Sequence, residues 1–166
     1  MIFNNIDFNN KTILITGGAG FIGSNLVFYF QENFPNAKVI VFDCFRSNEI
    51  FPNGNLKSFG HYKNLIGFKG DVICGNINNK VDLALLNDYK FDFIFHQAAI
   101  SDTRVYDQEM IMKTNVNSFQ DLLTISKNDS AVMVYMYACM YVCMCVCMYV
   151  CMYVCMYVCM YVRIPV

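Results

Sequence analysis

Three glycines, each separated from the next by two residues, form the pattern in this sequence that most clearly indicates chemistry: Gly17, Gly20 and Gly23. Between a strand and a helix, the first glycine allows a tight turn, the second lets the backbone approach a pyrophosphate, and the third allows close helix packing. The amides and positive dipole end of that helix attract phosphate groups. The spacing therefore predicts a phosphate-binding loop, with Phe21 and Ile22 among its binding residues.

A carboxylate follows this loop at a distance that suits a dinucleotide. Asp43 lies 20 residues after Gly23, where an acidic residue can bind the adenosine ribose. The alternative is a solvated residue at the end of a strand. Arg46 and Lys57 come next, and either cation could neutralise a ribose 2′-phosphate, although Arg46 could equally be an ordinary loop residue. These residues leave NAD and NADP both open, because Asp43 favours a free 2′-hydroxyl whereas the cations favour a phosphate.

The elements that must position these residues alternate between strands and helices. Short β-branched runs are typical of buried parallel strands, and apolar residues at helical spacing predict the helices. Pro35 ends the first helix. The expected strands cover residues 11–16, 38–42, 91–96 and 131–135, and the expected helices cover residues 21–34 and about 107–127. This order predicts an α/β fold with a Rossmann-type doubly wound parallel sheet.

The segment from Thr16 to Gly23 closely resembles the extended short-chain dehydrogenase/reductases, specifically the NAD(P)-dependent sugar-nucleotide epimerases and dehydratases. The segment from His96 to Ala99 matches the His-x-Ala-Ala turn of that family, which lines the nicotinamide side of the cleft. The resemblance also implies that an asparagine in the next helix holds the active-site geometry through backbone contacts. The cofactor-binding residues that it implies here are Gln97, Ala98, Ala99 and Asn115.

A narrower resemblance concerns residues 55–64 and 100–108, which look like ADP-glyceromanno-heptose 6-epimerases. Those enzymes invert one carbinol of a heptose during the synthesis of lipopolysaccharide precursors. The resemblance implies a tightly held NADP, which removes hydride from the sugar and returns it to the opposite face. It favours NADP over NAD, and it implies a nucleotide-sugar substrate and an oligomeric enzyme.

The narrower resemblance also assigns further site residues. Ser101, Asp102 and Thr103 would lie at the substrate edge of the cleft, and Arg104 stands where that pattern has a second threonine. Asn76 would contact the adenine at a position where the family has aspartate. Because asparagine still offers an acceptor oxygen, we expect weakened rather than lost binding.

Charge and cysteine content limit which partners and which cellular compartment can be expected. Residues 1–130 hold eleven Lys and Arg against thirteen Asp and Glu. Basic residues are therefore not in excess, and binding to nucleic acid is not predicted. Their two cysteines fit a reducing compartment, which predicts a cytoplasmic protein. The Asn-rich start of the chain has no apolar core, so it does not read as a signal peptide.

Residues from about 133 onward follow a four-residue repeat, which is regular as Met-Tyr-Val-Cys from Met148 to Val162. The nucleotide unit ATGT, read in triplets, encodes this order. We therefore predict an NAD(P)-binding domain over residues 1–130 and a low-complexity, non-native tract over 131–166, caused by a frameshift or an artefact. Its alternatives are an accidental membrane segment, since it exceeds the roughly 20 apolar residues of a spanning helix, and an aggregation-prone extended segment. Its cysteines lack histidine partners, so no metal site is predicted.

Catalysis in the resembled family needs a tyrosine as general acid/base, with a lysine four residues later. A free tyrosine titrates near pH 10, so lowering of its pKa by that lysine is required at neutral pH. No lysine follows Lys127, and no catalytic residue is therefore predicted. The sheet is expected to be incomplete and the chain inactive as written. The alternatives are a dinucleotide-binding module without catalysis, a non-functional fragment, or part of another sugar-nucleotide epimerase or dehydratase.

Overall fold

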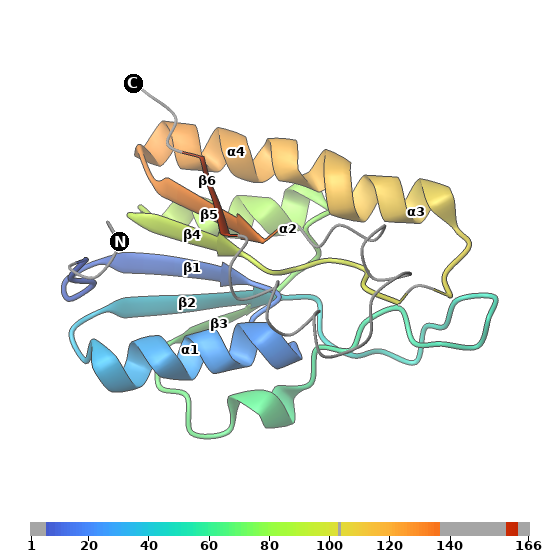
Figure 1. Ribbon diagram of the computed structural model, residues 1–166, viewed down its shortest axis with the longest axis horizontal. Helices are drawn as coiled ribbons and strands as arrows, with labels where there is room; N and C mark the ends of the chain where they lie inside the picture. The colour runs from blue at the N-terminus through green and yellow to red at the C-terminus, as the bar shows by residue number, and fades with distance from the viewer. Residues whose placement is uncertain (1–5, 103, 137–158, 163–166) are drawn as a thin grey trace.

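The computed structural model describes residues 6–102, 104–136 and 159–162, and within these a six-stranded sheet runs through the molecule (Figure 1). The strand order is β3-β2-β1-β4-β5-β6. The first five strands are parallel, and β6 pairs antiparallel with β5. Their bounds are β1 Thr12–Thr16, β2 Lys38–Asp43, β3 Asp71–Cys74, β4 Phe93–His96, β5 Val132–Met136 and β6 Cys159–Val162. The order reverses direction at β1, as in a doubly wound sheet.

Helices cover both faces of this sheet. The α-helices are α1 Phe21–Asn33, α2 Lys80–Ala84, α3 Gln108–Met112 and α4 Ser118–Asp129; η1 Tyr62–Leu65 and η2 Leu85–Asp88 are 3-10 turns, and η3 Lys113–Asn117 is a π-helical turn. Figure 1 shows α1 and η1 on one side of the sheet, with α2 and α4 on the other. The predicted helix over 21–34 is confirmed as α1, and the helix expected over 107–127 is confirmed as the continuous run α3, η3 and α4.

Alternation along the strands produces two apolar cores. In β1, Ile13 and Ile15 are fully buried beneath α1, together with Val27 and Phe30 of that helix. Leu14 points to the opposite face and joins the cluster formed with α2 and α4. A strand with both faces buried reads as a continuous apolar run, which is why the sequence signals of β1 and β2 were clear.

The fifth parallel strand begins just after the predicted domain boundary, within residues 131–166. β5 was expected over residues 131–135 and is confirmed at Val132–Met136, where it pairs with β4. Met133 is fully buried in the α4-side core. β6 lies within the repeat, whereas residues 137–158 and 163–166 of the tract lie outside the described residues. The domain division at 130 stays a prediction.

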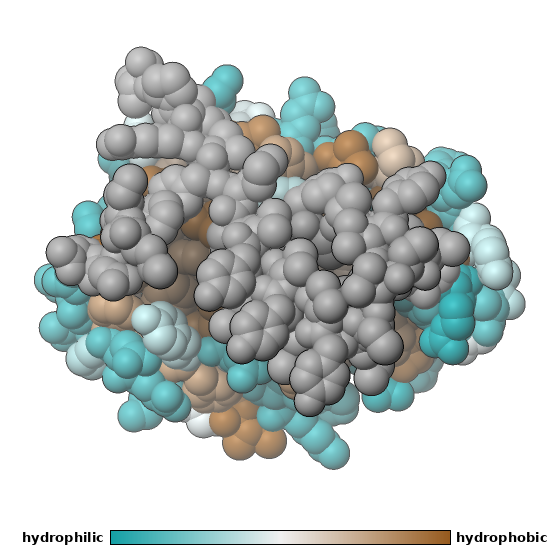
Figure 2. Space-filling model, viewed as in Figure 1, coloured by the Kyte–Doolittle hydropathy of each residue, from teal (hydrophilic) through white to brown (hydrophobic). Residues whose placement is uncertain are grey.

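The surface is mixed in character. Around the rim of the face in Figure 2, hydrophilic residues are found on every side, and hydrophobic residues lie among them. Within the described part of the chain, no helix is both long enough and apolar enough to cross a membrane.

Candidate functional site

The predicted binding residues lie on loops that leave one edge of the sheet, the carboxyl ends of its parallel strands. Thr16, the last residue of β1, is in register with Phe42 of β2 and with His96 of β4. Asp43 is in register with Cys74, the last residue of β3. The sequence-predicted segments after these four strands therefore start side by side, on both sides of β1, which is where open α/β sheets bind nucleotides.

The turn after β1 requires its first glycine. Gly17 has a φ of +69°, a conformation that side-chain-bearing residues rarely adopt. A Cβ at Gly17 would lie 2.6 Å from the backbone nitrogen of Ala98. The loop after β1 and the loop after β4 are therefore in direct backbone contact. Ala98 was predicted from the resemblance, and its position beside the glycine loop is fixed by this contact.

The other two glycines differ in what surrounds them. A Cβ at Gly23 would overlap the Gly17 carbonyl oxygen, so this glycine lets the start of α1 lie close against the loop that leaves β1, while the rest of α1 packs on the sheet. A Cβ at Gly20 would meet the same oxygen at 3.2 Å, a tight but tolerable approach. Gly20 is the N-cap of α1, with no capping side chain and no acidic residue in the first turn. The positive end of α1 is therefore not neutralised by its own first turn.

Asp43 lies against the glycine loop. Its Oδ2 accepts a hydrogen bond from the Ala19 amide at 3.0 Å, and its Oδ1 accepts one from the Phe45 amide at 2.9 Å. Burial raises the pKa of this carboxyl, and the hydrogen bonds from Phe45 and Ala19 oppose the rise. Gly60 returns the following loop to this point, because a Cβ there would overlap the carboxylate. Asp43, the last residue of β2, is thus held against the glycine loop, where the ribose contact is predicted.

Asn115 clamps the segment after β4. Its Oδ1 accepts a hydrogen bond from the Ile100 amide at 2.8 Å, and its Nδ2 donates to the Ile100 carbonyl at 3.0 Å. The residue lies in the π-helical turn η3, a type of irregularity that is frequent at functional sites. The contacts to backbone groups that the resemblance implied are present, whereas an active-site role for them stays a prediction.

A buried polar pair joins the ends of β1 and β4. Thr16 Oγ1 and His96 Nδ1 are hydrogen-bonded at 2.7 Å, and the Ala98 amide donates to the same hydroxyl at 3.4 Å. His96 is 2 % exposed, and burial lowers its pKa to about 4. Its ring is therefore neutral at pH 7 and stacks on the ring of Tyr135. The resemblance named the turn that contains His96, but this pairing with Thr16 was not predicted.

The two cations predicted to meet a 2′-phosphate differ in their surroundings. Lys57 Nζ lies 3.3 Å from Glu49 Oε2, in a short hairpin closed by a bridge between Ile50 and Leu56. Arg46 is exposed, and its backbone amide donates to the Gly60 carbonyl. Gly60 lies against Asp43, so the hydrogen bond between Arg46 and Gly60 keeps the Arg46 backbone near the Asp43 carboxylate. Lys57 is already paired with Glu49.

The remaining predicted residues lie at the rim of the site. Phe21 is 85 % exposed and Ile22 is also exposed, so both lie at the open start of α1. Asn76 Oδ1 accepts a hydrogen bond from the Asn78 amide, within a local turn after β3. Ser101 and Ala99 are exposed, whereas Gln97 is half-buried. Thr103 lies outside the described residues.

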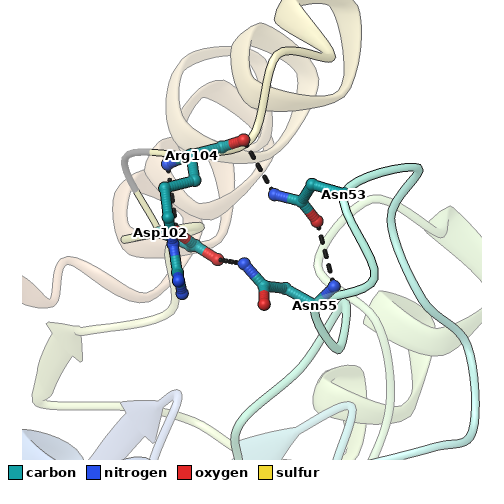
Figure 3. A network of polar contacts seen from close by, with 4 residues as sticks. All are labelled: Asn53, Asn55, Asp102 and Arg104. Carbon is teal, nitrogen blue, oxygen red and sulfur yellow. Dashed lines mark hydrogen bonds and ion pairs between the residues drawn. The ribbon is translucent and has the colours of Figure 1, made fainter.

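Asp102 differs from the neighbouring predicted substrate residues because its side chain already has hydrogen-bond partners. Its side chain is 8 % exposed, and it accepts hydrogen bonds from Asn55 and from Arg104 (Figure 3). The backbone and guanidinium hydrogen bonds of Arg104 lower the pKa of this carboxyl. Arg104, which departs from the resembled pattern, thus pairs with the residue two positions before it. A substrate contact by Asp102 stays a prediction.

Other kinds of site have less support. Two shallow cavities of about 330 and 470 Å³ lie at the opposite, amino edge of the sheet, around Lys11 and Asn36 respectively. Among the residues that the structure describes, no group of three or more His, Cys, Asp or Glu side chains could hold a metal ion. The predicted residues therefore come together at the carboxyl edge of the sheet, around the glycine loop.

The sequence between β1 and the segment after β5 matches a known family. The profile of the NAD dependent epimerase/dehydratase family matches residues 13–144. This chain belongs to that family. The match confirms the resemblance of the glycine loop, and it includes all the strands that carry predicted site residues.

Within the NAD dependent epimerase/dehydratase family, the chain is similar to heptose epimerases. It is 33 % identical over 125 residues to the ADP-L-glycero-D-manno-heptose-6-epimerase of Brachyspira hyodysenteriae, a match that covers 74 % of this chain and 36 % of that protein. The crystal structure of the enzyme of that name from Helicobacter pylori matches with a TM-score of 0.74 and 52 % identity, covering 84 % of this chain and 42 % of that one. The chain thus spans about a third of the curated relative's length.

A third similar protein is solved with a ligand. UDP-glucose 4-epimerase from Thermotoga maritima, with UDP-glucose, matches with a TM-score of 0.61 and 26 % identity, covering 75 % of this chain and 37 % of that one. The family is NAD-dependent by its description, and this member's title ligand is a nucleotide sugar.

Proposed function

We propose that this chain is the cofactor-binding part of an ADP-heptose 6-epimerase-like enzyme, that it binds NADP, and that it does not catalyse epimerisation by itself. The observation that carries the proposal is the contact between Asp43 and the glycine loop at the carboxyl edge. That contact combines an acceptor for ribose hydroxyls with a helix start suited to phosphate. The 52 % identity to the Helicobacter pylori heptose epimerase supports the same class.

The residues around the glycine loop fit a dinucleotide. Gly20 leaves the first turn of α1 free of a capping side chain, and Gln97 Oε1 is a buried acceptor without a hydrogen-bond partner among the described residues. A buried acceptor without a donor is costly, so a bound ribose or amide group would stabilise this side chain. A bound nicotinamide cofactor would supply the hydride acceptor for the family reaction. In this chain, Asn115 would hold the Ile100 backbone beside it.

The proposed preference for NADP depends on Arg46. Asp43 places negative charge where a 2′-phosphate would lie, and Lys57 is already paired with Glu49. Arg46 is the exposed cation of this loop that lies three residues after Asp43. Its planar guanidinium can bind a phosphate in bidentate geometry. We infer from the similar proteins that the wider substrate class is a nucleotide sugar. The two cysteines of residues 1–130 favour the cytoplasm as the working compartment.

The proposed lack of catalysis rests on the sequence after β5. The general acid/base tyrosine needs a lysine four residues later, and the sequence contains no lysine beyond Lys127. A reading frame shifted within the four-residue repeat accounts for this, with residues 131–166 as a non-native tract. A binding module without catalysis and a non-functional fragment are the alternatives, and saturable cofactor binding distinguishes them.

Fluorescence titration of the purified full chain with NADPH and NADH tests the proposal. We expect saturable binding, tighter for NADPH, and no turnover of an ADP-heptose. Arg46→Ala should weaken NADPH binding about tenfold and leave NADH binding unchanged, since only the 2′-phosphate contact is lost. The matched control is Lys63→Ala, a lysine on the exposed surface of η1. Absence of saturable binding to either dinucleotide would contradict the proposed function.

Long-read sequencing through the repeat tests the frameshift separately. We expect a region encoding Tyr-x-x-x-Lys downstream in another frame, with tract length varying between single molecules if the tract switches the gene on and off. A downstream sequence without that region in any frame would overturn the frameshift explanation and leave cofactor binding as the activity of this chain.

A further inference from the structure

Two loops on opposite sides of β1 are joined to each other by side chains. The first loop, residues 44–61, follows β2, and the second, residues 97–107, follows β4. Asn55 Nδ2 donates to Asp102 Oδ2, and Asn53 Nδ2 donates to the Arg104 carbonyl at 2.7 Å. Figure 1 shows both loops projecting together beyond the strand ends, and Figure 3 shows the four side chains between them. Since β1 lies between β2 and β4, the first loop crosses the point where the glycine loop begins.

The acceptor side of this connection engages both carboxylate oxygens of Asp102. Asp102 Oδ1 accepts from the Arg104 amide at 3.0 Å and from Arg104 Nε at 3.1 Å, which leaves Oδ2 facing Asn55. Hydrogen bonds to an ionised carboxylate are about twice as strong as neutral ones. The side chain of Asp102 is buried, although that of Arg104 is exposed. Asp102 therefore has the surroundings of a structural acceptor, not those of a group free to bind a sugar.

The donor side is rigid. Asn53 Oδ1 accepts from the Asn55 amide at 3.0 Å, and the Phe51 amide donates to the Asn55 carbonyl at 2.7 Å. These bonds fix Asn55 in a turn closed by the bridge between Ile50 and Leu56. The hairpin therefore holds the backbone of Asn55, from which the side-chain amide reaches Asp102.

Both loops are also tied to predicted cofactor residues at their bases. The His61 amide donates to the Ala19 carbonyl at 3.0 Å, so the first loop returns to the glycine loop. The second loop is clamped at Ile100 by Asn115. Movement of the joined loops would consequently displace residues on both the ribose side and the nicotinamide side of the predicted site.

We propose that the hydrogen bond between Asn55 and Asp102 is a latch, which holds the 44–61 loop to the 97–107 loop beside the proposed dinucleotide site and sets the rate at which bound dinucleotide leaves. This inference rests on the proposed cofactor binding. Asp102 is then a positioning residue that acts through the loop.

Stopped-flow displacement of NADPH from the full chain by excess NADP⁺ measures the latch. Asn55→Asp places a second carboxylate against Asp102, and we expect the dissociation rate to rise about tenfold or more, with a smaller change in the association rate. Asn55→Asp combined with Asp102→Asn restores one donor and one acceptor in exchanged positions, and it should return the rate to within about threefold of the original. Asn33→Ala is the control, because that side chain donates to the Tyr29 carbonyl within α1.

Amide hydrogen exchange on the ligand-free chain tests the same connection without cofactor. Asn55→Asp should increase exchange in residues 49–57 and in residues 100–105 together, and the exchanged pair should reverse both changes. An increase confined to residues 49–57 overturns the latch. So does NADPH binding with an unchanged dissociation rate in Asn55→Asp. If the unaltered chain binds neither dinucleotide, the proposed function and the control of release fail together.

Discussion

Thr16 and His96 lie next to each other at the carboxyl ends of β1 and β4, with Thr16 Oγ1 2.7 Å from His96 Nδ1. The pair is buried, and it lies directly beneath the contact between Gly17 and Ala98. The two loops that carry the predicted nicotinamide and phosphate contacts are therefore fastened to each other below the site. Substitutions that remove this hydrogen bond should change the free energy of unfolding before they change cofactor affinity.

Protonation of His96 should weaken the fold. Burial lowers its pKa to about 4, against about 6.5 in the unfolded chain. As pH falls from 6.5 to 4, the unfolded state binds a proton that the folded state does not. The stability contributed by His96 is complete above pH 6.5, and about 3 kcal/mol is lost by pH 4.

Denaturant unfolding of the full chain at a series of pH values checks this. His96→Gln should be less stable at pH 8 and should lose the extra slope between pH 6.5 and 4. An identical slope in the variant and the original chain would show that another group causes the pH dependence.

Alanine at Gly23 should mainly reduce stability, whereas alanine at Gly20 should mainly reduce binding. At Gly23 the new Cβ overlaps the Gly17 carbonyl, so we expect a loss of about 3 kcal/mol in the free energy of unfolding. At Gly20 the nearest protein atom is 3.2 Å away, so the loss should be about 1 kcal/mol or less. NADPH affinity should nevertheless fall about tenfold in Gly20→Ala, because the methyl group would occupy the path to the phosphates.

Thermal melts and fluorescence titration of both glycine variants separate these effects. Gly20→Ala that binds NADPH as tightly as the original chain would contradict a phosphate site at this loop.

Replacing Asp43 by Asn should change dinucleotide preference. The substitution removes the negative charge that opposes a 2′-phosphate, and it weakens the acceptor that favours a free ribose hydroxyl. We expect the ratio of NADPH to NADH affinity to rise about tenfold. One of the two amide hydrogen bonds, to Ala19 or Phe45, should be lost, at a cost of about 1 kcal/mol in stability.

Paired titrations with the two dinucleotides check the Asp43 prediction, with Asp7→Asn as a control at an exposed, distant carboxylate. An unchanged ratio would mean that Asp43 does not face the ribose.

Removing the Asn115 side chain should loosen the segment after β4. Asn115→Ala leaves the amide and the carbonyl of Ile100 without their side-chain partners. We expect a loss of about 2 kcal/mol in stability. Asn117→Ala, at an exposed position in the same π-helical turn, should cost less.

Chemical unfolding combined with amide exchange at Ile100 measures the Asn115 effect. Equal costs for the two asparagine variants would show that helix propensity, and not the clamp, is responsible.

Sequence reasoning was successful where local pattern and burial agree. The runs that became β1 and β2 are buried on both faces, and Gly17 adopts a conformation that strongly favours glycine, so composition alone identified them. β3 was not predicted, because its run of four residues is short and lies exposed or half-buried. The π-helical turn at Asn115 was also missed, since an extra residue in a helical turn barely alters the apolar spacing.

The connections between distant segments could not be read from the sequence. Asn55 and Asp102 are 47 residues apart, and nothing in the spacing of either residue indicates the other. The resemblance predicts that Asp102 lies near the sugar, and this stays a prediction; it gave no sign that Asn55 and Arg104 donate hydrogen bonds to this carboxylate. Only the path of the 44–61 loop, set by the whole sheet, brings these groups together.

The position of β1 between β2 and β4 has a consequence during synthesis. β1 meets β2 as soon as Asp43 has emerged from the ribosome, but its other edge pairs with β4, and Thr16 meets His96 across 80 residues. Until then β1, an interior strand of the finished sheet, exposes an unpaired edge, which is a template for association with other nascent chains. Translation speed between residues 43 and 96 should therefore affect the yield of folded protein more than translation speed after residue 96.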